Sequence, residues 1–482
     1  MNIKYILNLE GKILIILSLF MLTIFPWVFY WHETQLIKPL LFSFLLTLGC
    51  GLVLLFKTRH AEKRFKIKEA YFLVSAAWLT MGIIGSLPFY FSGAIPSFTD
   101  AVFESVSGFT TTGSSILTDI ESLPKSILYW RSLSHWIGGM GIIVLVVAIM
   151  PQLNIAGYQL LSAEMSGGIN YEKIKPRTKD VALRLWMVYF SITAIVVVLL
   201  MMGGLDFYES LCHSFGTVAT GGFSTKNDSI GAYSPYIQYV ITLFMLISGI
   251  NFTVLYFTFR GNFRRIIIDT ELKAYLGIIL TIGITITFIL WFIHNLSPEQ
   301  AFRDSFFQVI SILTATGFAT TDYLQWVDYA WFLIFLLMFA GACIGSTGGG
   351  IKIIRHVVAW KFIKRSFLSV LHPQVVKHIR VNGTMIPNDK VVSVIAFIAL
   401  YITIVVFSSV FMAALGLDIQ TATGSVLATI GGIGPGIGEV GPSGNFSQIP
   451  DVGKIYLSFI MILGRLEILT FLVVFTPGFW KV

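Results

Sequence analysis

The sequence predicts an all-α protein that crosses a membrane many times and is built from four similar units around one axis. Three observations lead to this prediction. Of the 482 residues, 55% are hydrophobic and only 12% are charged, whereas a soluble protein carries about twice that charge. The mean hydropathy is +0.80, and the apolar residues form stretches long enough to span a bilayer. A short segment rich in glycine and threonine also occurs four times at similar spacing.

Each glycine-containing segment follows an apolar stretch that is too short to cross a membrane, so we expect a half-length helix and a re-entrant loop. Two leading spans, residues 13–30 and 40–56, precede the first unit. Each unit is then a span, a half helix, a loop and a second span. The expected units are 71–92, 98–108 and 134–150; 185–203, 206–217 and 237–257; 275–293, 299–313 and 331–344; and 391–415, 419–429 and 455–475.

These units give the expected domain boundaries. They are residues 1–68 for the leading spans, 69–152 for the first repeat, 153–260 for the second, 261–365 for the third, 366–390 for a cytoplasmic loop and 391–482 for the fourth. Each unit crosses the membrane twice, so all four share one orientation. Parallel units of this kind can surround a single pseudo-fourfold pore, whereas secondary carriers more often show inverted repeats.

The charge distribution predicts the orientation. The net charge is +8, and the basic residues gather in the loops near residues 57–68, 173–179, 260–265 and 352–390, all on one side of the expected spans. By the positive-inside rule this side is cytoplasmic, as are both termini. The pattern disfavours a nucleic-acid partner and leaves the lipid bilayer as the surroundings. Acidic residues on the other side either concentrate cations or merely populate exported loops.

The chemistry expected of the four loops is cation binding by backbone carbonyls. The half helices point their C-terminal ends, each carrying roughly half a negative charge, at the membrane centre. Carbonyl oxygens can replace the water around an ion, and glycine permits the positive φ that such a loop needs. Close helix packing is the alternative use of these glycines. The predicted binding residues are Thr110, Thr111, Thr112, Gly113, Thr220, Gly221, Gly222, Thr314, Ala315, Thr316, Gly317, Gly431, Gly432, Ile433 and Gly434.

Other residue types argue against a catalytic centre. The three cysteines and eight histidines show no spacing typical of a disulfide framework or a metal site. No nucleophile and base cluster inside the expected spans. A polytopic membrane enzyme is therefore disfavoured, and no covalent cofactor is expected.

Three further features lie near the expected cytoplasmic side. The run Gly345–Gly350 breaks the span that begins at Trp331, and it either lines the pore or forms a flexible helix end. Arg465 lies in the middle of the last span, where it has either a functional role or a structural ion pair with another helix; Glu467 is not its obvious partner. Residues 375–386 predict a β-hairpin with Asn382 and Gly383 in the turn.

Three segments carry a family resemblance. Residues 103–113, 341–352 and 464–467 resemble the Trk/Ktr/HKT superfamily of potassium transporters, and the two leading spans are similar to the bacterial TrkH/TrkG branch. The resemblance covers essentially the whole chain. It implies potassium uptake across the bacterial inner membrane, with potassium ions in the filter and one pore in each protomer of a homodimer. It also implies a cytosolic, nucleotide-binding, TrkA-like regulatory ring.

The resemblance also assigns the remaining site residues. It implies that four filter glycines go with potassium preference, although the fourth loop departs most from the others. It implies an intramembrane gating loop and a pore-facing arginine. These gate residues are Gly345, Ser346, Thr347, Gly348, Gly349, Gly350, Lys352 and Arg465. Whether transport is passive or is symport coupled to protons or sodium stays open.

Overall fold

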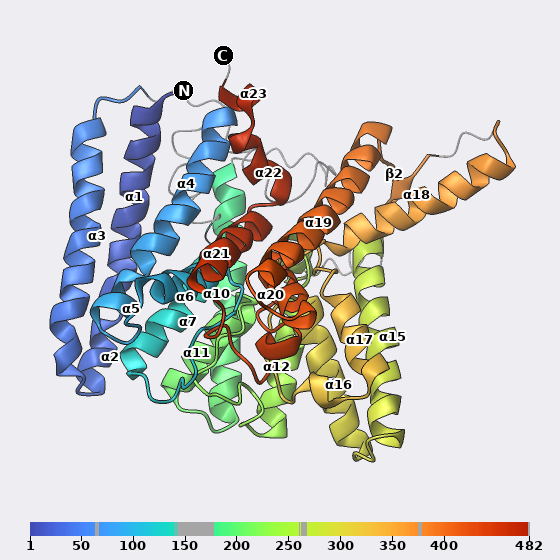
Figure 1. The fold of residues 1–482 in the computed structure, drawn as a ribbon, viewed down its shortest axis with the longest axis horizontal. Helices are drawn as coiled ribbons and strands as arrows, with labels where there is room; N and C mark the ends of the chain where they lie inside the picture. Colours follow the sequence, from blue (N-terminus) through green and yellow to red (C-terminus); the bar gives the residue numbers. More distant parts are fainter. Residues whose placement is uncertain are drawn as a thin grey trace.

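The computed structural model describes residues 1–62, 67–139, 141, 178–259, 261, 268–374 and 378–480. Within these ranges the regular secondary structure is helical apart from one two-stranded sheet. Both termini lie at the same end of the molecule (Figure 1). The predicted all-α fold is therefore confirmed. The basic segment at residues 173–177 lies outside the described residues.

Two leading helices form a pair at one side of the molecule. They are α1 Ile3–Leu22, continued by α2 Phe25–Tyr30, and α3 Ile37–Thr58, which follows the short helix η1 Thr34–Leu36. A Cβ placed on Gly11 would lie 2.8 Å from the carbonyl oxygen of Gly51, so the two helices pack closely. The predicted start of the first span at residue 13 was too late, because Tyr5, Ile6 and Leu9 continue the buried face of α1 toward the N-terminus.

The four units follow the leading pair in chain order. The first two comprise α4 Ile67–Gly85, α5 Leu87–Phe91, α6 Phe98–Phe109 and α7 Lys125–Gly139, then α10 Thr178–Met202, α11 Phe207–Val218, α12 Pro235–Ser248 and α13 Phe252–Phe259. The third comprises α15 Thr270–Phe292, α16 Pro298–Leu313, η3 Tyr323–Gln325, α17 Asp328–Leu337 and α18 Ile353–Leu371.

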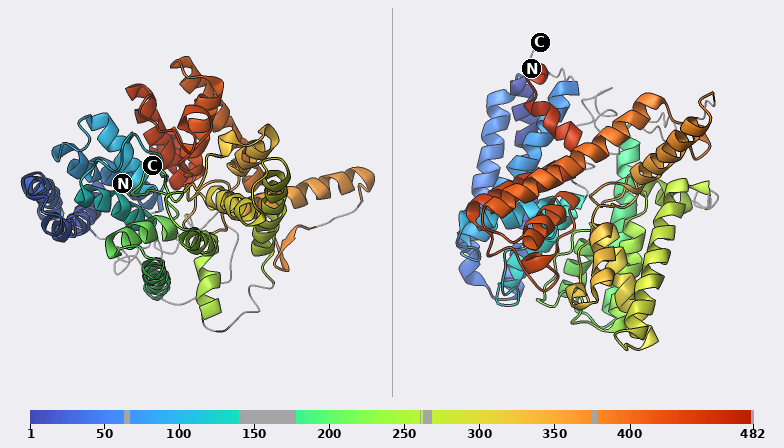
Figure 2. Two further views of the ribbon diagram at one scale, coloured as in Figure 1. Left: turned by 90° about the horizontal axis from the view of Figure 1, so that it is seen from below. Right: turned by 45° about the vertical axis from the view of Figure 1, so that its right-hand side comes forward.

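The fourth unit follows a short hairpin. The hairpin consists of β1 Arg380–Val381 and β2 Thr384–Met385, and the unit comprises α19 Asn388–Ala414, α20 Ile419–Gly431, η4 Gly438–Val440, α21 Asp451–Arg465, α22 Ile468–Leu472, η5 Val473–Phe475 and α23 Pro477–Trp480. Seen from below, the units follow one another around a common centre in the order cyan, green, yellow and red (Figure 2).

The four half helices begin for the same local reason. Each N-cap residue accepts a hydrogen bond from a backbone N–H in the first turn, as serine and aspartate side chains do at helix starts. The caps are Ser97 for α6, Asp206 for α11, Ser297 for α16 and Asp418 for α20. The sequence analysis predicted the half helices from their short apolar stretches and not from these caps, and its bounds agree with the structure to within a few residues.

In the second, third and fourth units the span that follows the loop is bent or ends early, which corrects the prediction of continuous helices. Among the described residues, six helices are long and apolar enough to cross a membrane, and two further bent pairs pass the same test together. Helices α12 and α13 meet at 104°, and α21 and α22 meet at 113°. Helix α17 ends at Leu337 instead of residue 344. Only the start of the predicted span 134–150 lies within the described residues.

The segment after the glycine run was also assigned wrongly. The sequence analysis treated residues 353–390 as a loop with a hairpin, but Ile353–Leu371 is the helix α18, which extends away from the body of the molecule (Figure 1). Its basic residues lower its hydropathy, so its sequence does not resemble a membrane span. The hairpin is confirmed where the structure describes it: Arg380 pairs with Met385 and Val381 with Thr384 in an antiparallel register. Residues 375–377 of the predicted hairpin lie outside the described residues.

Candidate ion pathway

The four glycine-containing loops share one backbone conformation. In each loop a residue with a left-handed backbone is followed two positions later by a glycine with positive φ. The pairs and their φ angles are Thr111 and Gly113 (55° and 84°), Thr220 and Gly222 (53° and 82°), Ala315 and Gly317 (56° and 81°), and Gly432 and Gly434 (64° and 97°). The pattern distinguishes Gly222 from Gly221 and gives the fourth loop the same register as the others.

Each half helix ends in the same set of backbone hydrogen bonds. The residue before the positive-φ glycine donates its N–H to the carbonyl five residues earlier. These bonds join Thr112 to Ser107, Gly221 to Gly216, Thr316 to Ser311 and Ile433 to Ala428, at 2.9, 2.8, 2.8 and 2.9 Å. This is the pattern of a helix closed by a left-handed residue. It fixes the position of each loop relative to its own helix.

The four loops touch one another in a closed cycle. A Cβ placed on Gly113 would lie 2.2 Å from the carbonyl oxygen of Gly221, and one on Gly222 would lie 2.0 Å from that of Thr316. A Cβ on Gly317 would lie 1.8 Å from the carbonyl oxygen of Ile433, and one on Gly434 would lie 3.0 Å from that of Thr112. Each glycine therefore lets its loop approach the next one, and the fourth loop returns to the first. The predicted residues of all four loops are brought together.

Side-chain hydroxyls support opposite loops of this ring. The hydroxyls of Thr110 and Thr112 lie 2.8 Å apart, and those of Thr314 and Thr316 lie 2.7 Å apart. The Ser114 hydroxyl donates to the carbonyl oxygen of Gly434 at 3.1 Å. The possible cation ligands of the ring are thus uncharged carbonyl and hydroxyl oxygens, which suit a monovalent cation such as an alkali metal ion.

A buried ion pair lies behind the first and second loops. Glu104 is fully buried, and its carboxylate accepts from Arg131 Nε at 2.6 Å and from the Ile116 N–H at 3.0 Å. Arg131 also donates to the carbonyl oxygen of Ser224 at 2.9 Å, and its guanidinium lies 3.5 Å from the centre of the Phe223 ring. The pair therefore joins the segments that follow two different loops. The sequence analysis missed it, although Glu104 stands within the segment that carries the family resemblance.

We expect Arg131→Met to destabilise the protein strongly. Methionine leaves the Glu104 carboxylate buried without its cation, and breaking a buried pair in this way costs about 3–5 kcal/mol. Thermal unfolding in detergent would measure the loss. Lys226→Met is the matched control, because the Lys226–Glu121 pair is 3.2 Å long and its side chains are 34% and 47% exposed, so it should cost less than about 1 kcal/mol. Equal, small losses in both variants would contradict a bracing role for Arg131.

The segments after the first and second loops are also joined nearer the surface. Asp119 Oδ1 accepts from the Asn227 side-chain amide at 3.2 Å, and the Ile120 N–H donates to Asn227 Oδ1 at 2.8 Å. The hydrogen bond from Asn227, together with those from Ser122 and Glu121, holds the pKa of Asp119 below its usual range. Asp119 therefore stays ionised at neutral pH.

The run Gly345–Gly350 lies against the ends of three half helices. Gly345 and Gly350 both have φ of 71°. The Thr347 hydroxyl donates to the carbonyl oxygen of Val218 at the end of α11, at 3.3 Å. A Cβ on Gly348 would lie 2.5 Å from the carbonyl oxygen of Thr314, and one on Gly349 would lie 2.4 Å from that of Gly431. We call residues 345–350 the glycine loop; it packs directly beside the ring.

Two cations hold the glycine loop. Lys352 Nζ donates to the carbonyl oxygen of Gly348 at 2.5 Å. Arg465 donates to the carbonyl oxygens of Thr347 at 2.7 Å and of Gly138 at 2.9 Å. Arg465 is not in the middle of a continuous span, as the sequence suggested, because it is the last residue of α21 at the bend. Its fork-shaped guanidinium connects the loop to the end of α7.

The ion-pair partner of Glu467 is Arg355. Its carboxylate accepts from Arg355 Nη2 at 2.6 Å, and Glu467 itself has a φ of 58° at the break between α21 and α22. The sequence analysis found Glu467 not to be an obvious partner of Arg465, and it gave no signal for Arg355. The Arg355–Glu467 contact joins α18 to the break between α21 and α22. The sequence analysis predicted neither the helix nor the break.

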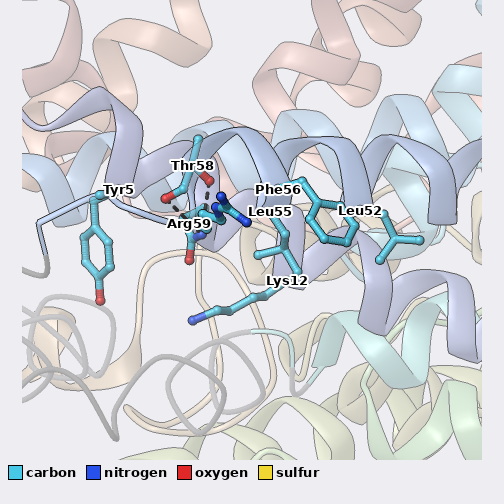
Figure 3. A pocket seen from close by; sticks show the side chains of 9 residues that line it. Tyr5, Lys12, Leu52, Leu55, Phe56, Thr58 and Arg59 are labelled. Carbon is cyan, nitrogen blue, oxygen red and sulfur yellow. Dashed lines mark hydrogen bonds between the residues drawn. The ribbon is translucent and has the colours of Figure 1, made fainter.

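A cavity of about 410 Å³ lies elsewhere, between α1 and α3 (Figure 3). It is lined by Tyr5, Asn8, Lys12, Leu52, Leu55, Phe56, Thr58, Arg59 and Ala61. All of these residues belong to the leading helices or the segment that follows them. The cavity is therefore separate from the ring of loops.

The fold and the ring together define a class of protein: a multi-pass helical membrane protein in which four units, each with a half helix and a glycine-containing loop, surround one centre. The model of the TrkH family, described as cation transport protein, matches residues 38–481. The chain therefore belongs to the TrkH family of cation transport proteins.

Individual relatives agree with this assignment. The Trk system potassium uptake protein TrkH of Escherichia coli K12 is 38% identical over 444 residues, which are 91% of each chain. TrkH of Halomonas elongata is 35% identical and covers 100% of both chains. The crystal structure of the potassium transporter TrkH from Vibrio parahaemolyticus matches with a TM-score of 0.90 at 34% identity, over 100% of both chains. These names describe transporters, as the sequence predicted, and not enzymes.

Proposed function

We propose that this chain takes up potassium ions across the bacterial inner membrane, through a filter formed by the carbonyl oxygens of the four loops. The observation that carries the proposal is the closed cycle of contacts in which each positive-φ glycine meets the loop that follows it. Residues with positive φ alternate with other residues in each loop. In such a backbone, successive carbonyl groups point to the same side of the chain. Four helix C-terminal ends, each with roughly half a negative charge, favour a cation at the centre.

The family relatives support potassium as the ion, since the relatives compared above are named as potassium transporters or uptake proteins. In this proposal the filter residues are those of the four loops, and potassium ions are the cargo and not a resident cofactor. Both termini and the basic loops face the cytoplasm, as the positive-inside rule predicts.

The glycine loop is the gate in this proposal. It packs against three half-helix ends and carries Lys352 and Arg465 beside it, so it obstructs the path and adds positive charge that opposes a cation. The family resemblance further implies a homodimer and a cytosolic, nucleotide-binding, TrkA-like ring that regulates this gate.

Ion flux from the purified chain in liposomes tests the proposal. We expect potassium flux to exceed sodium flux at equal concentration gradients, because the ring is built from neutral oxygen donors at fixed spacing. Equal permeation by both ions would contradict a potassium filter. The same vesicles with an imposed proton gradient separate passive flow from coupled transport: uphill potassium movement occurs only if the two are coupled.

A further inference from the structure

We propose that Glu271 is a positioning residue that fixes both ends of the glycine loop, and that the β1–β2 hairpin is attached to the same point, so that the hairpin and the loop move as one unit. The functional consequence rests on the proposed role of this loop as the gate. The structural part of the inference does not depend on that role.

Glu271 holds the glycine loop at both ends with one oxygen atom. The residue lies in the first turn of α15 and is 1% exposed. Its Oε1 accepts from the Ile344 N–H at 2.8 Å and from the Ile354 N–H at 3.2 Å. Ile344 immediately precedes the loop, and Ile354 lies in the first turn of α18 after it. One acceptor atom therefore joins the residue before the loop to the helix after it, so this carboxyl group closes the base of the loop.

The hairpin turn is attached to the same helix start. Asn382, at the tip of the hairpin, accepts from the Thr270 N–H at 2.7 Å, and its side-chain amide donates to Asp269 Oδ2 at 3.3 Å. Asp269 is the N-cap of α15 and accepts from the Leu272 N–H. Two adjacent residues of α15, Thr270 and Glu271, therefore contact the hairpin and the loop respectively.

Apolar packing joins the hairpin and the loop directly. A small hydrophobic cluster separate from the main core contains Ile344 and Ile354, which flank the glycine loop. The hairpin contributes Ile379, Val381 and Ile386 to the same cluster. Polar contacts through α15 and apolar contacts across the cluster thus connect the same two elements. A close-packed cluster transmits a displacement because it has little room to deform.

Two cationic side chains contact the glycine loop on the side away from Glu271. Arg465 and Lys352 hold the loop near its middle, whereas Glu271 holds its base. A displacement of the hairpin would therefore reach the base of the loop first, and would shift it relative to the ring. The hairpin is the part of this unit that a partner on the basic side of the protein could reach.

Hydrogen–deuterium exchange of the full-length protein in nanodiscs tests the contact of Glu271 directly. We expect peptides that contain the Ile344 and Ile354 amides to exchange about tenfold faster in Glu271→Ala, because both N–H groups lose their acceptor. Glu271→Gln keeps a carbonyl oxygen at this position and should stay within about twofold of the unmodified protein. The matched control is Glu69→Ala. Glu69 is another buried carboxylate that accepts a backbone N–H, that of Asn2 at 2.6 Å, and its loss should leave these peptides unchanged.

The contribution of the hairpin has its own variant. Asn382 has a φ of 50°, so Asn382→Gly removes the side chain without straining the turn. We expect about threefold faster exchange of the same loop peptides. Asn295→Gly is the control, because Asn295 also has positive φ, 53°, but lies beyond the opposite end of α15.

The outcomes separate this inference from the proposed gate. Unchanged exchange in Glu271→Ala, or equal acceleration in Glu271→Ala and Glu271→Gln, would overturn the clamp. Unchanged exchange in Asn382→Gly would overturn the attachment of the hairpin through the Asn382 side chain. Faster exchange with unchanged potassium flux in liposomes would support the clamp and contradict the loop's role as the gate.

Discussion

Gly317→Ala is expected to lower the preference for potassium over sodium at least tenfold. The alanine Cβ would lie 1.8 Å from the carbonyl oxygen of Ile433, so the third and fourth loops must separate. A shift of this size changes the oxygen spacing on which selection between ions depends. Reversal potentials in mixed potassium and sodium, measured on the purified protein in a bilayer, would report the change.

Two further glycine variants separate ring closure from backbone strain. Gly434→Ala also places alanine at positive φ, but its nearest contact is a milder 3.0 Å, to the carbonyl oxygen of Thr112. It should therefore impair selectivity less than Gly317→Ala. Gly93→Ala introduces the same kind of strain at φ of 72° with nothing within 4 Å, a cost of roughly 1–2 kcal/mol, and should leave selectivity unchanged. An equal loss of selectivity in all three variants would contradict the filter assignment.

Arg465→Ala should raise potassium flux severalfold and leave the ion preference alone. A positive charge opposes a cation by roughly 332/(ε·r) kcal/mol, or about 2 kcal/mol at about 8 Å and an effective ε of about 20. This corresponds to about thirtyfold in rate as an upper limit, because Lys352 remains beside the loop. The variant also releases the Thr347 carbonyl from its donor. Flux assays in liposomes measure the rate.

Arg465→Lys tests the two contributions separately. Lysine keeps the charge, but its single ammonium cannot reach the carbonyl oxygens of Thr347 and Gly138 in the way the guanidinium does. We expect flux between that of the unmodified protein and that of Arg465→Ala. A purely structural arginine predicts a lower melting temperature in both variants with no gain in flux, so melting temperature and flux should be measured on the same samples.

The half helices and their loops could be predicted because their signals are local. Ser97, Asp206, Ser297 and Asp418 are helix-capping residues, and a glycine follows each short apolar stretch. The same reasoning placed the hairpin, since Asn382 and Gly383 form a turn whatever surrounds them. A preference encoded in a few adjacent residues is readable without knowing the fold.

The breaks in the spans could not be predicted in the same way. Residues 455–475 are apolar enough for one helix, but Glu467 has a positive φ and pairs with Arg355 of α18, 112 residues earlier. The contacts of Glu271 on both sides of the glycine loop are also remote in sequence, at 73 and 83 residues. Hydropathy averages over a window and carries no information about such partners.

The sequence by itself determined the membrane class, the fourfold repetition and the residues that form the loops, because composition, caps and glycines act locally. The tertiary structure decided the register of the fourth loop, the closure of the ring and the partners of Glu104, Glu271 and Glu467. The reason is physical: a carbonyl meets a glycine, or a carboxylate its donor, only where folding brings distant segments together.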